Sequence, residues 1–162
     1  MAKRNRYRLP QILESSFNVA DADIFEVAST PERRTWVLPV VTEPASFNIV
    51  ISEDRSQIVF ETKICEIPST TNPNEGKFYR GLLESNASVY HGKLGLSVAP
   101  ETPQAIVFTR EFPKLGLPES VIADELRLFG KGVTRRFAEV VNIADNSDFP
   151  ISIAGKHRYP TN

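Results

Sequence analysis

Residues 78–112, near the middle of the chain, constrain the fold more than any other stretch, because one helical pattern and two strand patterns follow closely on one another. In residues 78–86 the apolar side chains recur at the spacing that places them on one face of a helix. Residues 94–96 and 106–112 alternate apolar side chains with glycine or polar ones, which is the period of a half-buried strand. The stretch therefore predicts a helix that enters a hairpin. It carries no cluster of reactive groups, so we expect it to serve packing or docking.

The other elements complete one α+β domain. Residues 9–18 predict a short amphipathic helix, and residues 119–140 predict the longest helix, because apolar side chains recur at steps of three and four. Three stretches rich in strand-forming residues lie between the first and middle helices, at residues 35–41, 47–52 and 57–67, and their short connections favour antiparallel pairing. The predicted fold is α+β, an antiparallel sheet of about five strands with helices on one face, in the order α-β-β-β-α-β-β-α.

Proline and glycine positions add local expectations. Pro39 indicates that its strand is an edge strand or a bulged one. Gly130 and Gly132 weaken the last helix by about 1 kcal/mol each relative to alanine, which indicates a place where the helix packs closely on the sheet. Gly92 and Gly95 are expected to let strand backbone pass close to a helix.

The length of 162 residues suits a single domain that buries roughly two-thirds of the surface exposed by the unfolded chain. The expected parts are a basic arm at residues 1–8, the α+β domain at residues 9–145 and an extended tail at residues 146–162, with a short strand near residues 149–153. The arm holds four positive charges and leaves 15 basic and 20 acidic side chains, a net of −5, for the rest. An acidic body argues against nucleic acid as a partner, and binding through the basic arm is the alternative.

The cysteine content and the apolar runs bear on location. Cys65 is the single cysteine, so no intrachain disulfide can form. No apolar export segment follows the basic start, and no apolar run approaches the roughly 20 residues needed to cross a bilayer. We therefore expect a cytoplasmic protein without a membrane partner.

Few residues suit catalysis. His91 and His157 lie in a predicted turn and in the tail, and neither is next in sequence to an acidic or cysteine partner. A metal site built from His91, Cys65 and a carboxylate is the alternative to a solvated histidine and a strand cysteine. A nucleophilic Cys65 would need an activating base or a helix N-terminus, which an apolar strand does not offer. We expect no enzymatic activity, no metal and no cofactor.

The strand at residues 36–41 is the best candidate for a surface that contacts a protein partner. It is rich in valine and leucine, and an edge strand of this kind can accept an added strand or a bound peptide. The alternative is that its side chains belong to the core, and no sequence argument separates the two.

Three stretches carry a likeness to a known group of proteins. They are Leu82-Leu83-Glu84-Ser85-Asn86, Gly92-Lys93-Leu94-Gly95-Leu96 and residues 106–113, which a long closing helix follows. Together they resemble the Tir-chaperone group of type III secretion chaperones and the related YbjN-like proteins, over roughly residues 64–141. The resemblance implies a small α+β protein without enzymatic activity, usually a homodimer with its middle helix near the dimer contact. In the secretion chaperones, an unfolded segment of a partner protein lays apolar side chains on the sheet and the first helix.

On this chain the resemblance implies dimer contacts at Phe78, Leu82, Leu83 and Asn86. It implies partner contacts at Leu13, Val37, Leu38, Ile49 and Ile51. The basic arm, the segment at residues 24–34 and the tail distinguish this chain from the secretion chaperones. The leading hypothesis is a non-enzymatic, homodimeric, chaperone-like module that binds an apolar segment of a protein partner. The alternatives are a YbjN-like regulatory protein of unknown ligand and a nucleic-acid-associated regulator that uses the basic arm.

Overall fold

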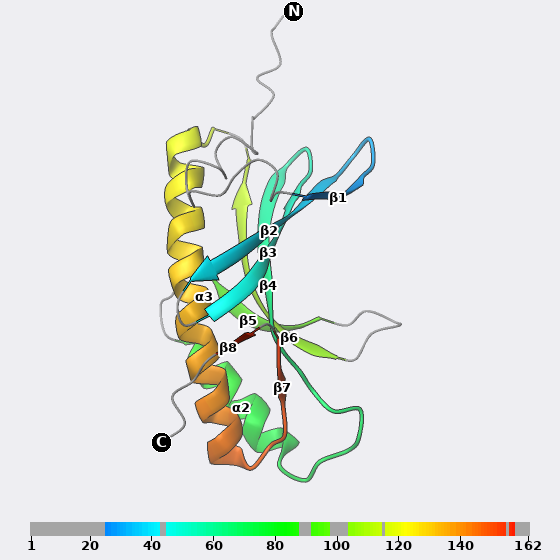
Figure 1. Cartoon of the computed structure of the whole chain (residues 1–162), viewed down its shortest axis with the longest axis vertical. Helices are drawn as coiled ribbons and strands as arrows, with labels where there is room; N and C mark the ends of the chain where they lie inside the picture. The colour runs from blue at the N-terminus through cyan, green and yellow to red at the C-terminus, as the bar shows by residue number, and fades with distance from the viewer. Residues whose placement is uncertain are drawn as a thin grey trace, which may run out of the picture.

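The computed structural model describes residues 25–42, 45–87, 92–97, 104–114, 116–154 and 156–157. The predicted helix at residues 9–18, the basic arm and His91 lie outside these ranges. Within them, the chain forms an antiparallel sheet and two helices, as Figure 1 shows. The strands are β1 (Phe25–Ser29), β2 (Arg34–Thr42), β3 (Ala45–Glu53), β4 (Gln57–Glu66), β5 (Lys93–Ser97), β6 (Ala105–Pro113), β7 (Ser152–Ile153) and β8 (Lys156–His157). The helices are α2 (Glu75–Asn86) and α3 (Glu119–Ser147).

The main path of the sheet runs β1-β2-β3-β4-β6-β5, and every pair in it is antiparallel. The two short strands lie off this path, because β7 pairs with β4 and β8 pairs with β3. The predicted α+β class and the order of elements after the first helix are confirmed, with six strands in the path where about five were expected. The additional strand is β1, which pairs with β2 at one end of the path.

Alternation along the strands separates a core face from an outer face. Leu38 lies opposite Ile49, and Ile51 lies opposite Phe60, so these apolar side chains form rows on one face. All four are fully buried. Pro39 lies beyond the last residue of β2 that pairs with β1, so its missing N–H removes no hydrogen bond with β1. The strand is thus interior along its first half and an edge along its second half among the described strands.

Helix α3 runs along one face of the sheet (Figure 1). Large aromatic side chains fill the core between the helix and the sheet. The Phe129 ring stacks on Phe108 with 4.9 Å between the ring centroids. A Cβ atom added at Gly132 would lie 3.2 Å from the Phe108 ring, which confirms that a glycine marks close packing of this helix on the sheet. A Cβ atom added at Gly92 would lie 2.6 Å from the carbonyl oxygen of Thr109. The backbone at Gly92 therefore passes close to strand β6, where a close approach to a helix was expected.

The C-terminal part of α3 extends further than its sequence pattern indicated. The helix continues to Ser147 and ends where Asp148 adopts a left-handed conformation, with φ of 52°. Phe149 then turns back and stacks on Phe78, with 4.5 Å between the ring centroids. The boundary expected at residue 145 therefore falls inside α3, and the described residues that follow pack on the domain where an extended tail was expected.

No stretch of either described helix is both long and apolar enough to cross a membrane.

Candidate functional site

Helix α2 lies against the C-terminal half of α3, and a glycine sets the distance between them. A Cβ atom at Gly81 would lie 2.6 Å from Cγ2 of Ile143, closer than real Cβ contacts come. Lys77 donates a hydrogen bond to the carbonyl oxygen of Asn146, and Ser85 contacts Arg136. Since increasing residue numbers on α2 match decreasing numbers on α3, the two helices run antiparallel.

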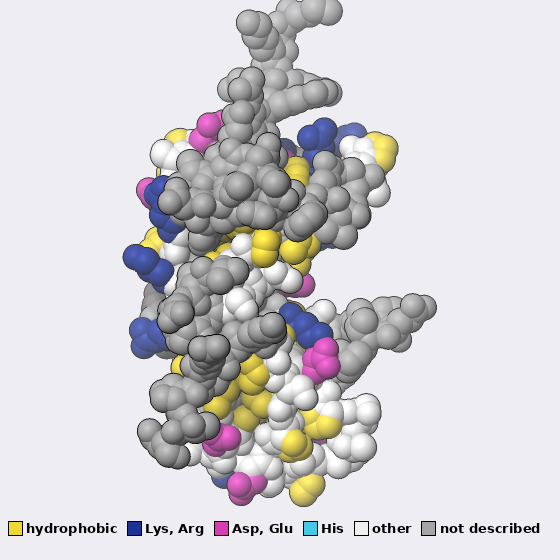
Figure 2. Space-filling model, viewed as in Figure 1, with side chains coloured by type: hydrophobic (Ala, Val, Ile, Leu, Met, Phe, Trp, Pro, Cys, Tyr) yellow, Lys and Arg dark blue, Asp and Glu magenta, His cyan; other side chains and the backbone are white. Residues whose placement is uncertain are grey.

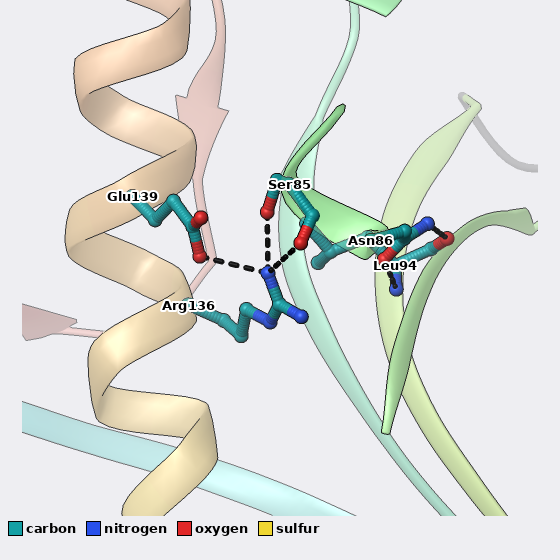
Figure 3. Close-up of polar contacts among 5 residues, drawn as sticks. All are labelled: Ser85, Asn86, Leu94, Arg136 and Glu139. Carbon is teal, nitrogen blue, oxygen red and sulfur yellow. Dashed lines mark hydrogen bonds and ion pairs between the residues drawn. The ribbon is translucent and has the colours of Figure 1, made fainter. Parts of the chain in front are cut away.

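A buried arginine ties the end of α2 to α3. Arg136 is only 1% exposed, and its Nη1 donates to the carbonyl oxygen of Ser85 at 3.3 Å and to Oε2 of Glu139 at 2.8 Å (Figure 3). The Ser85 hydroxyl is a further partner of the same nitrogen. Burying a guanidinium group is costly unless it is paired, and the last carbonyl groups of a helix need donors. The cluster pairs Nη1 of Arg136 with a carboxylate, supplies a donor to the Ser85 carbonyl, and so orients α2.

A side chain also joins α2 to the sheet. The Asn86 amide donates to the carbonyl oxygen of Leu94 and accepts from its N–H, both at 2.8 Å (Figure 3). This pair of bonds copies what a neighbouring strand would offer to β5. The end of α2 is therefore fixed to β5, the last strand of the sheet path.

The four residues expected at a dimer contact occupy three different environments. Phe78 and Leu82 are buried in the core of their own chain, and Asn86 is engaged by Leu94. Leu83 is 71% exposed. Successive helical residues point about 100° apart, so the adjacent leucines Leu82 and Leu83 face the core and the solvent respectively. The expected dimer contact therefore does not extend to the side chains of Phe78 and Leu82, because both are buried within their own chain. Leu83 is the exposed member of the set.

A second exposed leucine lies on the strand that α2 contacts. Leu96 pairs with the buried Ile106, so it lies on the face of the sheet that bears the helices, and it is 47% exposed. Leu83 precedes Asn86 by about one helical turn, and Leu96 follows Leu94 on the same face of β5, so each leucine lies one step along its own element from the Asn86–Leu94 link. We call Leu83 and Leu96 the α2–β5 rim. Sequence reasoning missed Leu96, because its alternation with Leu94 marked both as core and could not show that the strand is at an edge.

The residues expected to contact a protein partner are mostly not accessible. Leu38, Ile49 and Ile51 are fully buried beneath the helices, so the expected contact at these side chains is corrected. Val37 is half-buried on the opposite face of the sheet, and Leu13 lies outside the described residues. Residues 36–41 were expected either to face a partner or to belong to the core. Trp36, Leu38 and Val40 are buried, so these three belong to the core.

A half-open groove of about 630 Å³ lies between α2 and α3. Its charged lining consists of the cations Lys77, Arg80 and Arg135 and the carboxylates Glu84 and Glu139. Two amides, Asn142 and Asn146, line it as well. This volume is within the range of known ligand sites, about 300–1,000 Å³. We call this feature the α2–α3 groove.

The described residues carry little reactive chemistry. Burial raises the pKa of the Cys65 thiol to about 12, so the thiol stays protonated at neutral pH and is a poor nucleophile. Among the described residues, no three His, Cys, Asp or Glu side chains gather into a possible metal site. What the described surface does offer is an apolar rim and a charged groove that adjoin on α2.

Comparison with known proteins places the fold in a known class. No family model matches the sequence, and no curated protein matches it. Among solved structures, one match shares the α+β fold of this chain. The structure is that of YbjN from E. coli, described as a candidate transcription regulator; it has a TM-score of 0.55 and 14% sequence identity, and the match covers 90% of this chain and 94% of that one. The suspected likeness to YbjN-like proteins is thereby confirmed at the level of the fold.

Proposed function

We propose that this protein is a non-enzymatic protein-binding module that self-associates through the α2–β5 rim. The observation that carries the proposal is the 71% exposure of Leu83 on a helix that is otherwise fixed tightly to its own domain. An exposed leucine beside a second one on an edge strand is a small apolar surface of the kind that protein contacts cover.

Burial of the rim leucines would contribute to association. Full burial of a leucine side chain is worth about 1.5–3 kcal/mol, and a two-fold contact would bury the exposed part of both leucines in each of two copies, against an association cost of about 4–15 kcal/mol. Asn86 already pairs the outward backbone groups of Leu94 at this edge of β5, so the proposed contact rests on the leucine side chains. A second copy of this chain carries the same edge and the same leucines, which makes it a self-complementary partner.

The absence of enzymatic activity is supported by chemistry and by the neighbour. Cys65 is buried and protonated, and the described residues do not assemble a metal cluster. YbjN, the structural neighbour, is described as a candidate transcription regulator. A regulatory role, in which the rim contacts a protein other than a second copy, is therefore the second candidate function.

The test is the solution mass of the full chain by size-exclusion chromatography with light scattering. The wild type is expected at twice the chain mass of 18.1 kDa at high micromolar concentration, and Leu83→Glu and Leu96→Glu are expected at the monomer mass. Leu128→Glu is the matched control, because Leu128 is another exposed leucine, 36% accessible, on the separate helix α3. A monomeric wild type, or a Leu83→Glu variant that stays dimeric, contradicts the proposal.

A further inference from the structure

Basic side chains follow one line across α3 and α2. On α3, Arg127, Lys131 and Arg135 recur every four residues, which places them roughly 6 Å apart along the helix. Figure 2 shows Lys and Arg side chains along the edge of the molecule that α3 forms in this view. Arg135 lines the α2–α3 groove, where Arg80 and Lys77 continue the line on the facing wall. We call these five residues the basic track.

The antiparallel packing of the helices gives the basic track its length. Lys77 contacts Asn146 near the end of α3, so the track runs from Arg127 to the level of residue 146. Nineteen residues of helix rise about 28 Å, which corresponds to roughly eight phosphates along one strand of duplex DNA. The cations are therefore spread along a line and do not converge on one point.

Nearby carboxylates leave the track positive. Glu139 accepts from the buried Arg136, and Asp124 pairs with Arg127. Glu84 is the other carboxylate of the groove. With Arg136 and the exposed Asp145 counted, six cations face four carboxylates, and the amides of Asn142 and Asn146 add donors that can bind phosphate or sugar oxygens.

We propose that the basic track binds the phosphodiester backbone of a nucleic acid, with the α2–α3 groove seating part of that backbone. A half-open groove continued by a row of cations fits an extended polyanion better than a compact anion, which converging cations would hold. The net charge of −5 outside the arm argued against such a partner, but net charge averages over the surface, and the track gathers cations on one side.

This surface is distinct from the rim of the proposed function. Leu83 lies about 200° around α2 from Gly81, the glycine that packs against α3, but only about 60° from Arg80. The rim therefore lies outside the centre of the groove and adjoins the basic track at Arg80. The two proposals can fail independently.

The test measures binding of the full chain to a fluorescent DNA duplex of about 20 base pairs by anisotropy, over about 50–200 mM salt. Five phosphate contacts predict that affinity falls about 500-fold over this range, because the logarithm of the binding constant falls by about 0.9 per contact for each unit in the logarithm of salt. Arg80→Gln combined with Lys131→Gln removes two contacts and reduces the fall to about 40-fold. Both side chains are exposed, so the folded state should survive, which circular dichroism checks.

Arg34→Gln combined with Arg55→Gln is the charge-matched control, because both arginines are exposed on the hairpin ends of the sheet. The control is expected to keep the salt dependence of the wild type, and so is a chain that lacks residues 1–8. The affinity for a single-stranded RNA of equal length, measured in parallel, shows whether the protein prefers duplex DNA or RNA. Binding of either nucleic acid supports the proposal. No binding at the lowest salt, an equal loss in the control, or a loss only on deleting residues 1–8 overturns it.

Discussion

The contact between α2 and α3 at Gly81 makes a quantitative prediction about stability. A Cβ atom there would lie 2.6 Å from Cγ2 of Ile143, 3.5 Å from its Cγ1 and 3.6 Å from its Cβ. At Gly76, in the first turn of the same helix, a Cβ atom would meet nothing within 4 Å. The same substitution, glycine to alanine, can therefore be compared on one helix at a closely packed position, Gly81, and at an open position, Gly76.

The two substitutions are expected to differ in sign. Replacing a helical glycine by alanine gains up to about 1 kcal/mol of helix propensity, so Gly76→Ala should raise the free energy of unfolding by as much as that. Overpacking a closed site costs about 1–3 kcal/mol, so after the same gain Gly81→Ala should lower the free energy of unfolding by about 0–2 kcal/mol. The two variants should differ by about 1–3 kcal/mol.

A double-mutant cycle isolates the cause. Ile143→Ala removes Cγ2 and Cγ1, the two atoms nearest to the added methyl group, and leaves the Cβ at ordinary contact distance. Gly81→Ala should therefore lose its cost in the Ile143→Ala background and become stabilising like Gly76→Ala. The expected coupling free energy is about 1–3 kcal/mol, favourable to the double variant.

Urea unfolding followed by circular dichroism measures all four chains at equal concentration, so that self-association affects each alike. If Gly81→Ala stabilises as much as Gly76→Ala, or if the cycle gives no coupling, the close approach of the two helices at this point is refuted.

Two further predictions concern other polar contacts. Asn86→Ala should lower the free energy of unfolding by about 1–3 kcal/mol, since it leaves the N–H and carbonyl groups of Leu94 without their partner, whereas Asn142→Ala on the exposed side of α3 should change little; urea unfolding compares them. Asp54 accepts hydrogen bonds from the backbone N–H groups of Ser56 and Gln57, which lower the pKa of its carboxyl below 3.8. A lowered pKa contributes stability above the unfolded value that is lost as pH falls through the folded value, so Asp54→Ala should be less stable than the wild type at about pH 7 and should approach it as the pH falls through the lowered pKa. A difference that grows on acidification would contradict this reasoning.

Local periodicity accounts for the parts of the fold that the sequence predicted. The helix and hairpin at residues 78–112 appear as α2, β5 and β6, because each depends on contacts between residues close in the chain. The end of α3 was placed too early, since Ala144 continues the apolar face after Val140 but is a weak hydrophobic signal. The segment beyond it is held by Phe149 stacking on Phe78, a contact that residue spacing cannot reveal.

The site was harder to predict, because sequence patterns identify apolar residues but not what covers them. Leu82 and Leu83 are identical in type and adjacent, yet one is buried and the other exposed. Leu94 and Leu96 alternate in phase, yet the edge position of β5 leaves the second uncovered. Which residues a partner can reach is decided by tertiary packing.

Arg136 is the residue for which a sequence signal existed. It follows Val133 by three residues and precedes Val140 by four, so its spacing assigns it to the core face of α3. A cation at a core position predicts a buried pair, and the structure supplies Glu139 and the end of α2. A charged residue on an apolar face was therefore a better pointer to the α2–α3 junction than any apolar residue.

The position of α2 follows from three contacts that act on different sides of a short helix. Gly81 brings it against Ile143, Arg136 holds the Ser85 carbonyl, and Asn86 joins it to Leu94. Each contact uses the core side or the end of the helix, so the remaining sides stay available. Leu83 and Arg80 are three residues apart and lie only about 60° from each other, so the proposed protein surface adjoins the proposed basic surface on this 12-residue helix. Because neighbouring side chains couple, we expect the effects of substitutions at Leu83 and Arg80 to be non-additive.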